Sequence, residues 1–211
     1  PVGGPFESTA GDILANGGVP QLLQADSRDF DDGINRVLSI LSEATAADRA
    51  YVWQIHPGPD PEDPGLYIPQ LYEWAGSAKP LSQIMDGTAQ NQPLSSSIPS
   101  WLKMFQSGRC VKGPVKEMPM PEREVLEAQG ILSSLVAPIT FEGTLWGFIG
   151  FDDCRDERQW SDFEEKILLA AGTLVGTAIQ NRGITDALAD TRQDLERMNI
   201  QLEQAIARAS E

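Results

Sequence analysis

Two apolar runs joined by a two-residue turn constrain the fold of this chain more than its other features do. They form the stretch ILSSLVAPITFEGTLWGFIGFDD, residues 131–153, with Glu142-Gly143 between the runs. A two-residue connection of this kind predicts a β-hairpin. Neither run alternates apolar and polar residues, and a strand without alternation is covered on both faces. We therefore expect this hairpin at the middle of a sheet, with helices or a ligand above and below it.

The segments before the hairpin predict a mixture of helices and further strands. Pro69 lies in the second of these strands, and because proline cannot donate to a ladder, that strand is expected at an edge of the sheet. The order of elements predicts an α+β fold. The expected elements are a helix over 29–46, strands over 49–56 and 66–74, a helix after Pro99, a strand from Cys110 and a helix over 120–130.

The last predicted helix begins after the N-cap Ser161 and continues to the end of the chain. Up to about Ile179 it has apolar residues on two faces, so one face is expected to pack on the sheet and the other on a partner. Beyond Ile179 only one heptad seam is apolar, and nothing else in the sequence can cover it. We therefore expect a parallel coiled-coil homodimer. The seam residues are Ile184, Leu188, Leu195, Met198 and Leu202.

These patterns divide the chain into three parts. Residues 1–27 contain five glycines and three prolines with little periodicity, which favours a linker or a loosely docked arm. Residues 28–180 hold the predicted sheet and its helices, and residues 181–211 form the coiled-coil signalling helix. The seam reaches the last residues of the chain, so we expect it to continue into a downstream output domain of a longer protein.

Charge and hydropathy argue against two classes of partner. The chain has 31 acidic and 16 basic residues, a net charge of -15, which repels nucleic acid and anionic lipid. Its longest uncharged stretch in the second half is 15 residues, whereas a membrane-spanning helix needs about 20. Two cysteines do not make a disulfide framework. We expect a cytoplasmic domain that contacts neither nucleic acid nor membrane.

Three segments, taken in order, resemble a GAF domain over about residues 29–180. They are DRAYVWQI, LEAQGILSSLVAPITFEGTLWGFIGFDDC and RQWSDFEEKILLAAGTLVGTAI. The chain is similar in particular to GAF domains that precede PAS, histidine-kinase or diguanylate-cyclase modules in bacterial signalling proteins, including two-component systems. The resemblance implies an antiparallel sheet of five or six strands, with the first and last helices on one face and a pocket on the other. It also implies a sensor of a small molecule, and it leaves the ligand and any cofactor unknown.

The residue patterns of particular GAF subfamilies are not met here. Bilin-binding members attach their chromophore through a cysteine usually followed by a histidine, but the single histidine, His56, follows Ile55. Cyclic-nucleotide-binding members carry an Asn-Lys pair that this sequence lacks before Trp160. One histidine in a proline-rich segment is also a poor basis for a haem or metal site. We expect neither a catalytic site nor a metal site.

Aromatic residues give the most useful indication of a ligand. In the implied fold, the first two strands and the helix after Pro99 surround the pocket, so a flat or apolar molecule is favoured. Adjacent strand residues point to opposite faces, so Asp152 and Asp153 are not expected to form an acid/base pair, and we expect them mainly to hold the following loop. The candidate ligand-binding residues are Trp53, Tyr72, Trp74, Trp101, Phe105, Cys110 and Asp152.

Two other functions stay open. One is a ligand-free dimerisation scaffold whose pocket is filled by its own side chains. The other is a GAF-fold thiol redox enzyme of the free methionine sulfoxide reductase type, which would use Cys110 and Cys154. A collapsed pocket would favour the scaffold. Thiols facing one cavity, with Cα atoms under about 7 Å apart, would favour the enzyme.

Overall fold

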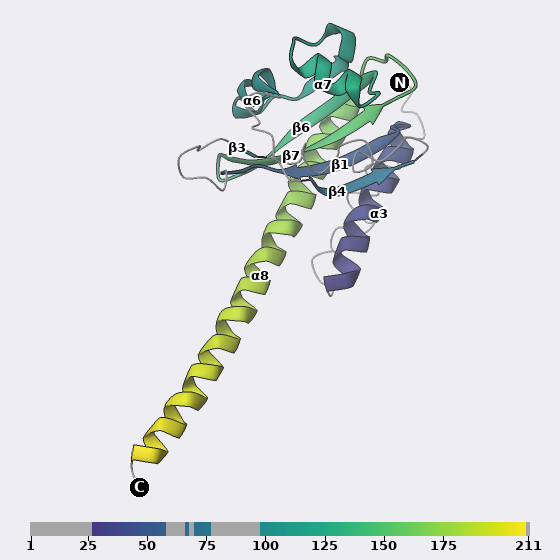
Figure 1. Cartoon of the computed structure of the whole chain (residues 1–211). Coiled ribbons are helices and arrows are strands. Elements are labelled where there is room, and N and C mark those ends of the chain that lie inside the picture. Colours follow the sequence, from purple (N-terminus) through teal and green to yellow (C-terminus); the bar gives the residue numbers. More distant parts are fainter. Residues whose placement is uncertain (1–26, 58–65, 68–69, 77–97, 210–211) are drawn as a thin grey trace. The chain divides into compact units, whose positions relative to one another are not determined.

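The structure is a computed structural model that describes residues 27–57, 66–67, 70–76 and 98–209 (Figure 1). The predicted arm, residues 1–27, lies outside this part of the chain except for Ser27. The helices are α3 (Ser27–Thr45), α6 (Pro99–Gln106), α7 (Glu122–Ala128) and α8 (Asp162–Ala209), and a 3-10 turn, η2, covers Val115–Glu117. The strands are β1 (Arg49–Gln54), β2 (His56–Pro57), β3 (Leu66–Tyr67), β4 (Gln70–Ala75), β5 (Val111–Pro114), β6 (Ser133–Phe141) and β7 (Thr144–Asp153).

Five of the described strands form one antiparallel sheet in the order β4-β1-β7-β6-β5. The β6–β7 hairpin turns through Glu142 and Gly143, whose φ angles of 49° and 80° are both positive, as a type I′ turn requires. Strand β7 pairs with β1 and β6, which confirms the predicted central hairpin. Strand β4 is an edge strand, as predicted, although Pro69 itself lies outside the described residues. The single strand predicted over 66–74 is in fact two, because β3 pairs with β2 instead.

Helix α3 and the first part of α8 cover one face of this sheet. From β4, Tyr72 donates a hydrogen bond of 2.8 Å to Asp31 of α3. From α8, Gly172 packs so closely that a Cβ at this position would lie 2.8 Å from Ile149 of β7. The buried residues Leu168 and Val175 of α8 carry the predicted sheet-facing stripe. The α+β architecture with the first and last helices on one face is therefore confirmed.

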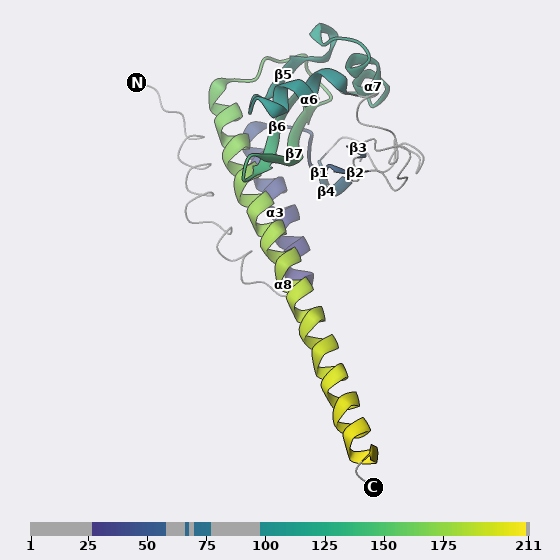
Figure 2. The ribbon, with the colours of Figure 1, turned by 90° about the vertical axis from the view of Figure 1, so that its left-hand side faces the viewer.

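Helices α6 and α7 lie on the opposite side of the sheet from α3 (Figure 2). They contribute Trp101, Phe105 and Leu126 to a buried cluster that also contains Tyr51 and Trp53 of β1. We call this side the α6/α7 face. It is the side on which the resemblance implies a ligand pocket.

Helix α8 is a single helix of 48 residues. Its start is a capping box: Ser161 Oγ accepts the Glu164 N–H at 3.2 Å, and Glu164 Oε2 accepts the Ser161 N–H at 2.7 Å. This confirms the N-cap predicted at Ser161. The chain divides into two compact units, Pro1–Gly176 and Thr177–Glu211, while the predicted boundary at residue 180 stays a prediction. None of the helices in the described ranges is both long and apolar enough to cross a membrane.

Candidate functional site

A polar row crosses the α6/α7 face of the sheet at the end of β7. The strand register places Arg49 of β1 opposite Asp152 of β7, and Asp152 opposite Ser134 of β6. Tyr51, two residues along β1 and on the same face, donates a hydrogen bond of 3.2 Å to Asp152 Oδ1. Ser134 Oγ donates to the same oxygen at 2.8 Å. All four residues of this row are buried.

The two charged members of the polar row are only partly satisfied. Arg49 Nη2 donates to the Gln129 carbonyl oxygen at 2.9 Å, but Arg49 Nε and Nη1 and Asp152 Oδ2 have no hydrogen-bond partner among the described residues. Burial raises the pKa of Asp152 to about 6, against the opposing effects of the Ser134 hydrogen bond and the Arg49 charge. Such incompletely paired buried groups are uncommon in native proteins and are typical of functional sites.

An aromatic cluster lies beside the polar row on the α6/α7 face. The Trp53 and Phe148 rings are nearly parallel, at 6.3 Å between centroids, and Phe105 stacks on Phe148 at 5.6 Å. Trp101 meets Phe148 edge-on. The structure thus brings together three of the predicted ligand residues, Trp53, Trp101 and Phe105. Whether they contact a ligand stays a prediction.

Two of the predicted ligand residues lie on the other face. Strand β4 pairs with β1 so that Tyr72 is opposite Val52 and Trp74 is opposite Ala50, which places both on the side of α3. The prediction that they line the pocket with Trp53 is wrong. The sequence does not show the register of β4, and a shift of one residue exchanges the two faces of a strand. The face of an aromatic residue on β4 therefore cannot be read from the sequence alone.

The two cysteines are far apart in the sheet. Cys110 precedes β5, whose first residue is opposite Val136, whereas Cys154 follows Asp153, which is opposite Ser133. About five residues of β6 separate the two positions, or roughly 16 Å, which is beyond disulfide reach. Burial raises the pKa of Cys110 to about 12 and that of Cys154 to about 11, so neither is an activated thiol. The thiol pair that a redox enzyme would need is not formed.

Cys110 also departs from the predicted pocket. Its thiol lies beside Glu165 of α8, whose charge and hydrogen bond add to the effect of burial on the Cys110 pKa. Because α8 covers the opposite face, Cys110 is not part of the α6/α7 face. The prediction of Cys110 as a pocket residue is wrong for this reason, whereas Asp152 does lie on the pocket side.

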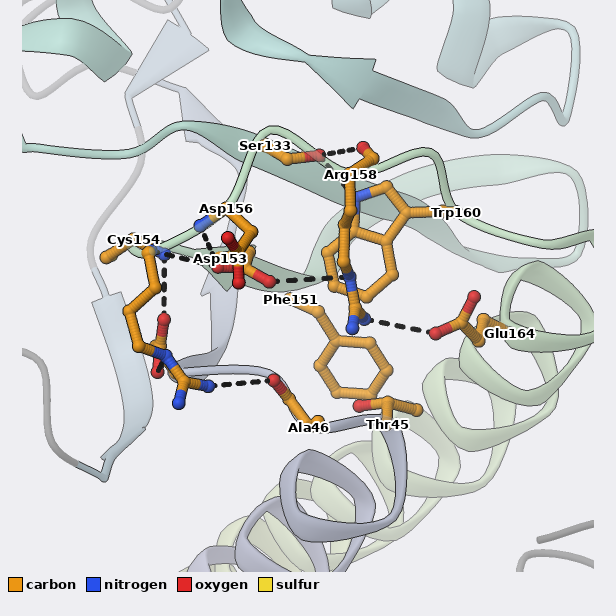
Figure 3. Close-up of polar contacts among 12 residues, drawn as sticks. Thr45, Ala46, Ser133, Phe151, Asp153, Cys154, Asp156, Arg158, Trp160 and Glu164 are labelled. Atoms are coloured by element: carbon orange, nitrogen blue, oxygen red, sulfur yellow. Dashed lines mark hydrogen bonds and ion pairs between the residues drawn. The ribbon is translucent and has the colours of Figure 1, made fainter.

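Asp153 holds the loop that follows β7 (Figure 3). Its Oδ1 accepts the N–H groups of Arg155 and Asp156, each at 2.9 Å. The prediction that adjacent acids face opposite ways is confirmed. The prediction that they hold the loop is confirmed for Asp153 and wrong for Asp152, whose side chain bonds to hydroxyl groups on the other face.

The same loop is tied to the start of α8 through Arg158. Its guanidinium carbon lies 3.7 Å from the ring centroid of Trp160, its Nε lies 3.5 Å from Asp153 Oδ2, and its Nη2 donates to Glu164 Oε1 at 3.0 Å (Figure 3). Trp160 Nε1 donates to Ser133 Oγ at 2.9 Å. Arg158 and Ser133 carry no motif signal in the sequence and were not predicted as functional residues.

The segment between α3 and β1 joins this assembly through Asp48. Its Oδ1 pairs with Arg155 Nε at 2.7 Å, and its Oδ2 accepts the Cys154 N–H at 2.8 Å. Arg155 Nη2 also donates to the Ala46 carbonyl oxygen at 3.3 Å (Figure 3). The contacts of Asp48, Asp153 and Arg158 together connect the α3–β1 segment, β7 and α8, and we call this region the junction.

A shallow, mainly apolar groove lies at the junction. Its volume is about 300 Å³, and Thr45, Phe163, Glu164 and Ile167 are among its lining residues. Phe163 and Ile167 occupy the same heptad positions as Ile184 and Leu188 of the seam, three heptads earlier in α8. Within the described ranges, no group of three or more histidine, cysteine, aspartate or glutamate residues could hold a metal ion.

The sheet order, the first and last helices on one face and the two short helices on the other define a GAF fold. Residues 29–179 match the GAF domain family, and the chain belongs to this family. GAF domains are generally sensory or regulatory modules. The prediction of a signalling GAF domain is confirmed.

One curated relative is a regulatory kinase. The Methanogenesis regulatory histidine kinase FilI of Methanothrix harundinacea (strain 6Ac) is 39% identical over 180 residues, which cover 84% of this chain and 19% of the relative. The chain therefore spans about a fifth of the length of this relative.

Solved structures of low sequence identity share the fold. The phycoerythrobilin-bound GAF domain from a cyanobacterial phytochrome has a TM-score of 0.62 and 18% identity, with 88% of this chain and 100% of that chain covered. The GAF domain from a phosphoenolpyruvate-protein phosphotransferase of Coxiella burnetii has a TM-score of 0.61 and 13% identity, with 87% and 99% covered.

Proposed function

We propose that this chain is a sensory GAF module that forms a homodimer through α8 and passes a signal along that helix to an output domain. The exposed apolar seam of α8 is the observation that carries this proposal. The kinase relative supports an output domain of the histidine-kinase class in a longer protein. A cytoplasmic location, and the expectation of no nucleic-acid or membrane partner, rest on charge and hydropathy.

The seam has the properties of a dimer interface. Each of its five residues is more than half exposed in the single chain, and they recur at heptad spacing along one side of α8. A row of large apolar side chains exposed in this way marks an interaction surface. The seam residues and their exposed fractions are Ile184 61%, Leu188 68%, Leu195 53%, Met198 56% and Leu202 59%.

Charged residues of the same segment are paired within the helix rather than along the seam. Arg182 pairs with Asp186 at 3.0 Å and Arg192 with Glu196 at 2.9 Å, both four residues apart. Three seam positions are polar, Thr177, Asn181 and Thr191. A polar residue at such a position fixes the register of a coiled coil at some cost in stability. These features support a defined parallel pairing.

The junction supplies a route from the sheet to the seam helix. Asp153 ends the central strand, and Arg158 links Asp153 to Glu164 in the first turn of α8. A ligand that binds one arrangement of the sheet better than another would shift the population of α8 arrangements in the dimer.

A ligand-free dimerisation scaffold is the second candidate function. The close packing of Trp53, Phe105 and Phe148 supports it, because these side chains fill the middle of the α6/α7 face. Native mass spectrometry distinguishes the two candidates. A dimer carrying an extra small mass that leaves on denaturation supports the sensor, whereas a dimer without it supports the scaffold.

The dimer is tested with two matched substitutions on α8. Leu195 and Ile200 are equally exposed in the single chain, at 53% and 55%, but Leu195 lies on the seam and Ile200 lies opposite it. We expect Leu195→Lys to weaken the dimer by about 100-fold or more in analytical ultracentrifugation, and Ile200→Lys to leave it unchanged. A monomeric wild-type chain, or equal effects of the two substitutions, would overturn the proposed dimer.

A further inference from the structure

We propose that Arg49 and Asp152 bind the ammonium and carboxylate groups of a small α-amino acid with an apolar side chain. The carboxylate would bind Arg49 and the ammonium would bind Asp152. Binding of the amino acid at this site does not depend on the proposed function. Only the effect of binding, a signal passed along α8, rests on the proposed function.

Arg49 offers unused donors in a buried position. A guanidinium has five N–H donors, and Arg49 uses one contact, from Nη2 to the Gln129 carbonyl oxygen. Its Nε and Nη1 have no partner among the described residues, and the side chain is 2% exposed. Buried donors of this kind are normally satisfied by protein, water or a bound group. The planar fork of a guanidinium matches the two oxygens of a carboxylate.

Asp152 offers the complementary acceptor. Tyr51 and Ser134 both donate to its Oδ1, and its fully buried Oδ2 is left without a partner. Although Arg49 and Asp152 are opposite each other in the register, no ion pair within 4.0 Å joins them among the described contacts. A third group between the two side chains would satisfy both.

The charges favour a zwitterion over an anion. Arg49 and an ionised Asp152 sum to zero, and a zwitterionic ligand keeps the buried total at zero. A lone carboxylate would leave an uncompensated buried negative charge unless a proton were also taken up, and a phosphate would leave more. An α-amino acid is the smallest common molecule that carries both charges next to each other.

The neighbourhood of the pair favours an apolar side chain on the ligand. The Tyr51 ring, whose hydroxyl bonds to Asp152, meets the Trp53 ring edge-on at 6.4 Å. Trp53 in turn stacks on Phe148. The charged end of the site therefore borders the aromatic cluster, where an aliphatic or aromatic side chain is better accommodated than a polar one.

Among the described groups around Asp152, the carboxyl group itself titrates near neutral pH. Burial holds the pKa of Tyr51 well above its usual range and raises that of Cys154 to about 11, so both stay protonated. The charge of Glu73 on β4 raises the Asp152 pKa, and that of Arg49 lowers it. Because the ammonium needs an ionised Asp152, amino-acid binding should weaken in acid, whereas a lone carboxylate that binds with a proton should bind more tightly.

The test is isothermal titration of the full chain with the common L-amino acids, followed by matched analogues of the best binder. For L-phenylalanine, the analogues are 3-phenylpropionate, which lacks the ammonium, and phenethylamine, which lacks the carboxylate. We expect saturable binding of an apolar amino acid, about 100-fold weaker binding of either analogue, and about tenfold weaker binding at about pH 5 than at about pH 7.5.

Two substitutions and a control complete the test. Arg49→Gln and Asp152→Asn should each weaken binding about 100-fold, and Arg109→Gln, at an exposed position, should have no effect. Circular dichroism checks that each variant folds, and the analogue and pH comparisons use the wild-type chain and do not depend on the variants.

Three outcomes would overturn the site. They are no saturation by any amino acid below about 10 mM, equal binding of the des-amino acid, or tighter binding in acid. A crystal structure with only water between Arg49 and Asp152, at a saturating concentration of amino acid, would also overturn the site. If the chain dimerises but binds no amino acid, the proposed site is wrong and the proposed dimer is not affected. If the chain binds an amino acid as a monomer, the proposed dimer is wrong and the proposed site is not affected.

Discussion

The guanidinium of Arg158 lies over the indole of Trp160, 3.7 Å from the ring centroid, and reaches both Asp153 at the end of β7 and Glu164 in the first turn of α8. An arginine held over an aromatic face gains a cation–π attraction in addition to its ion pairs. The start of the terminal helix is therefore positioned by a side chain that precedes the helix.

Replacing Trp160 by Phe should destabilise the domain by about 1–2 kcal/mol. The change keeps an aromatic ring next to Phe151 but removes the Nε1 donor to Ser133 Oγ. Urea unfolding at fixed protein concentration measures the effect. In a double-mutant cycle with Ser133→Ala, the two changes should be non-additive by about 1 kcal/mol, and simple additivity would contradict the assigned hydrogen bond.

Replacing Glu164 by Ala should cost about 1–2 kcal/mol, because it removes both the capping box with Ser161 and the ion pair with Arg158. Glu196→Ala is the matched control. It breaks the exposed pair with Arg192 on the same helix and should change the free energy of unfolding by about 0.5 kcal/mol or less. Equal losses in the two variants would show that Glu164 acts only as a surface charge.

Asp152 should make the stability of the protein depend on pH. Its pKa is raised from 3.8 to about 6 in the folded chain, so its carboxyl group binds a proton more tightly in the folded state than in the unfolded state. The contribution of the protonated Asp152 to the free energy of unfolding is fully present below about pH 4. It is lost as the pH rises through about 6, which lowers the free energy of unfolding by about 3 kcal/mol. Unfolding of wild type and Asp152→Asn from about pH 4 to about pH 7 measures it.

The difference in unfolding free energy between the two proteins should move in favour of Asp152→Asn as the pH rises. Tyr51→Phe serves as a further check. It removes a hydroxyl group that lowers the Asp152 pKa, so the pH at which stability is lost should move upwards. A constant difference between wild type and Asp152→Asn across this range would contradict a raised pKa.

Both thiols should react slowly in the folded protein. With pKa values of about 12 for Cys110 and about 11 for Cys154, the thiolate fraction at about pH 8 is lowered about 100-fold or more relative to the unfolded chain. Alkylation with iodoacetamide, followed by intact mass spectrometry, measures the two rates. After mild oxidation of the folded chain, a mass loss of two hydrogens would show that the cysteines do meet, against their separation in the sheet.

The parts of the fold that the sequence could predict depend on local patterns. The apolar runs on both sides of Glu142-Gly143 predict a central hairpin because a strand without alternation of apolar and polar residues is buried on both faces. Ser161 predicts the start of α8 because an N-cap residue is recognised from its immediate neighbours in the sequence.

The parts that the sequence could not predict depend on long-range register. The sequence predicts Tyr72 and Trp74 on the pocket side, but their pairing with Val52 and Ala50 places them on the side of α3. The polar row has the same origin, since Arg49 and Asp152 are about a hundred residues apart and meet through strand pairing. No local signal marks such a pair as neighbours.

The opposite orientations of Asp152 and Asp153 have an evolutionary consequence. A change at Asp152 alters the face toward α6 and α7, while the loop contacts of Asp153 stay in place. Selection can therefore act on the α6/α7 face and on the loop before the terminal helix as separate traits, although the two residues are neighbours in the chain. Related domains should vary at the first acid more readily than at the second.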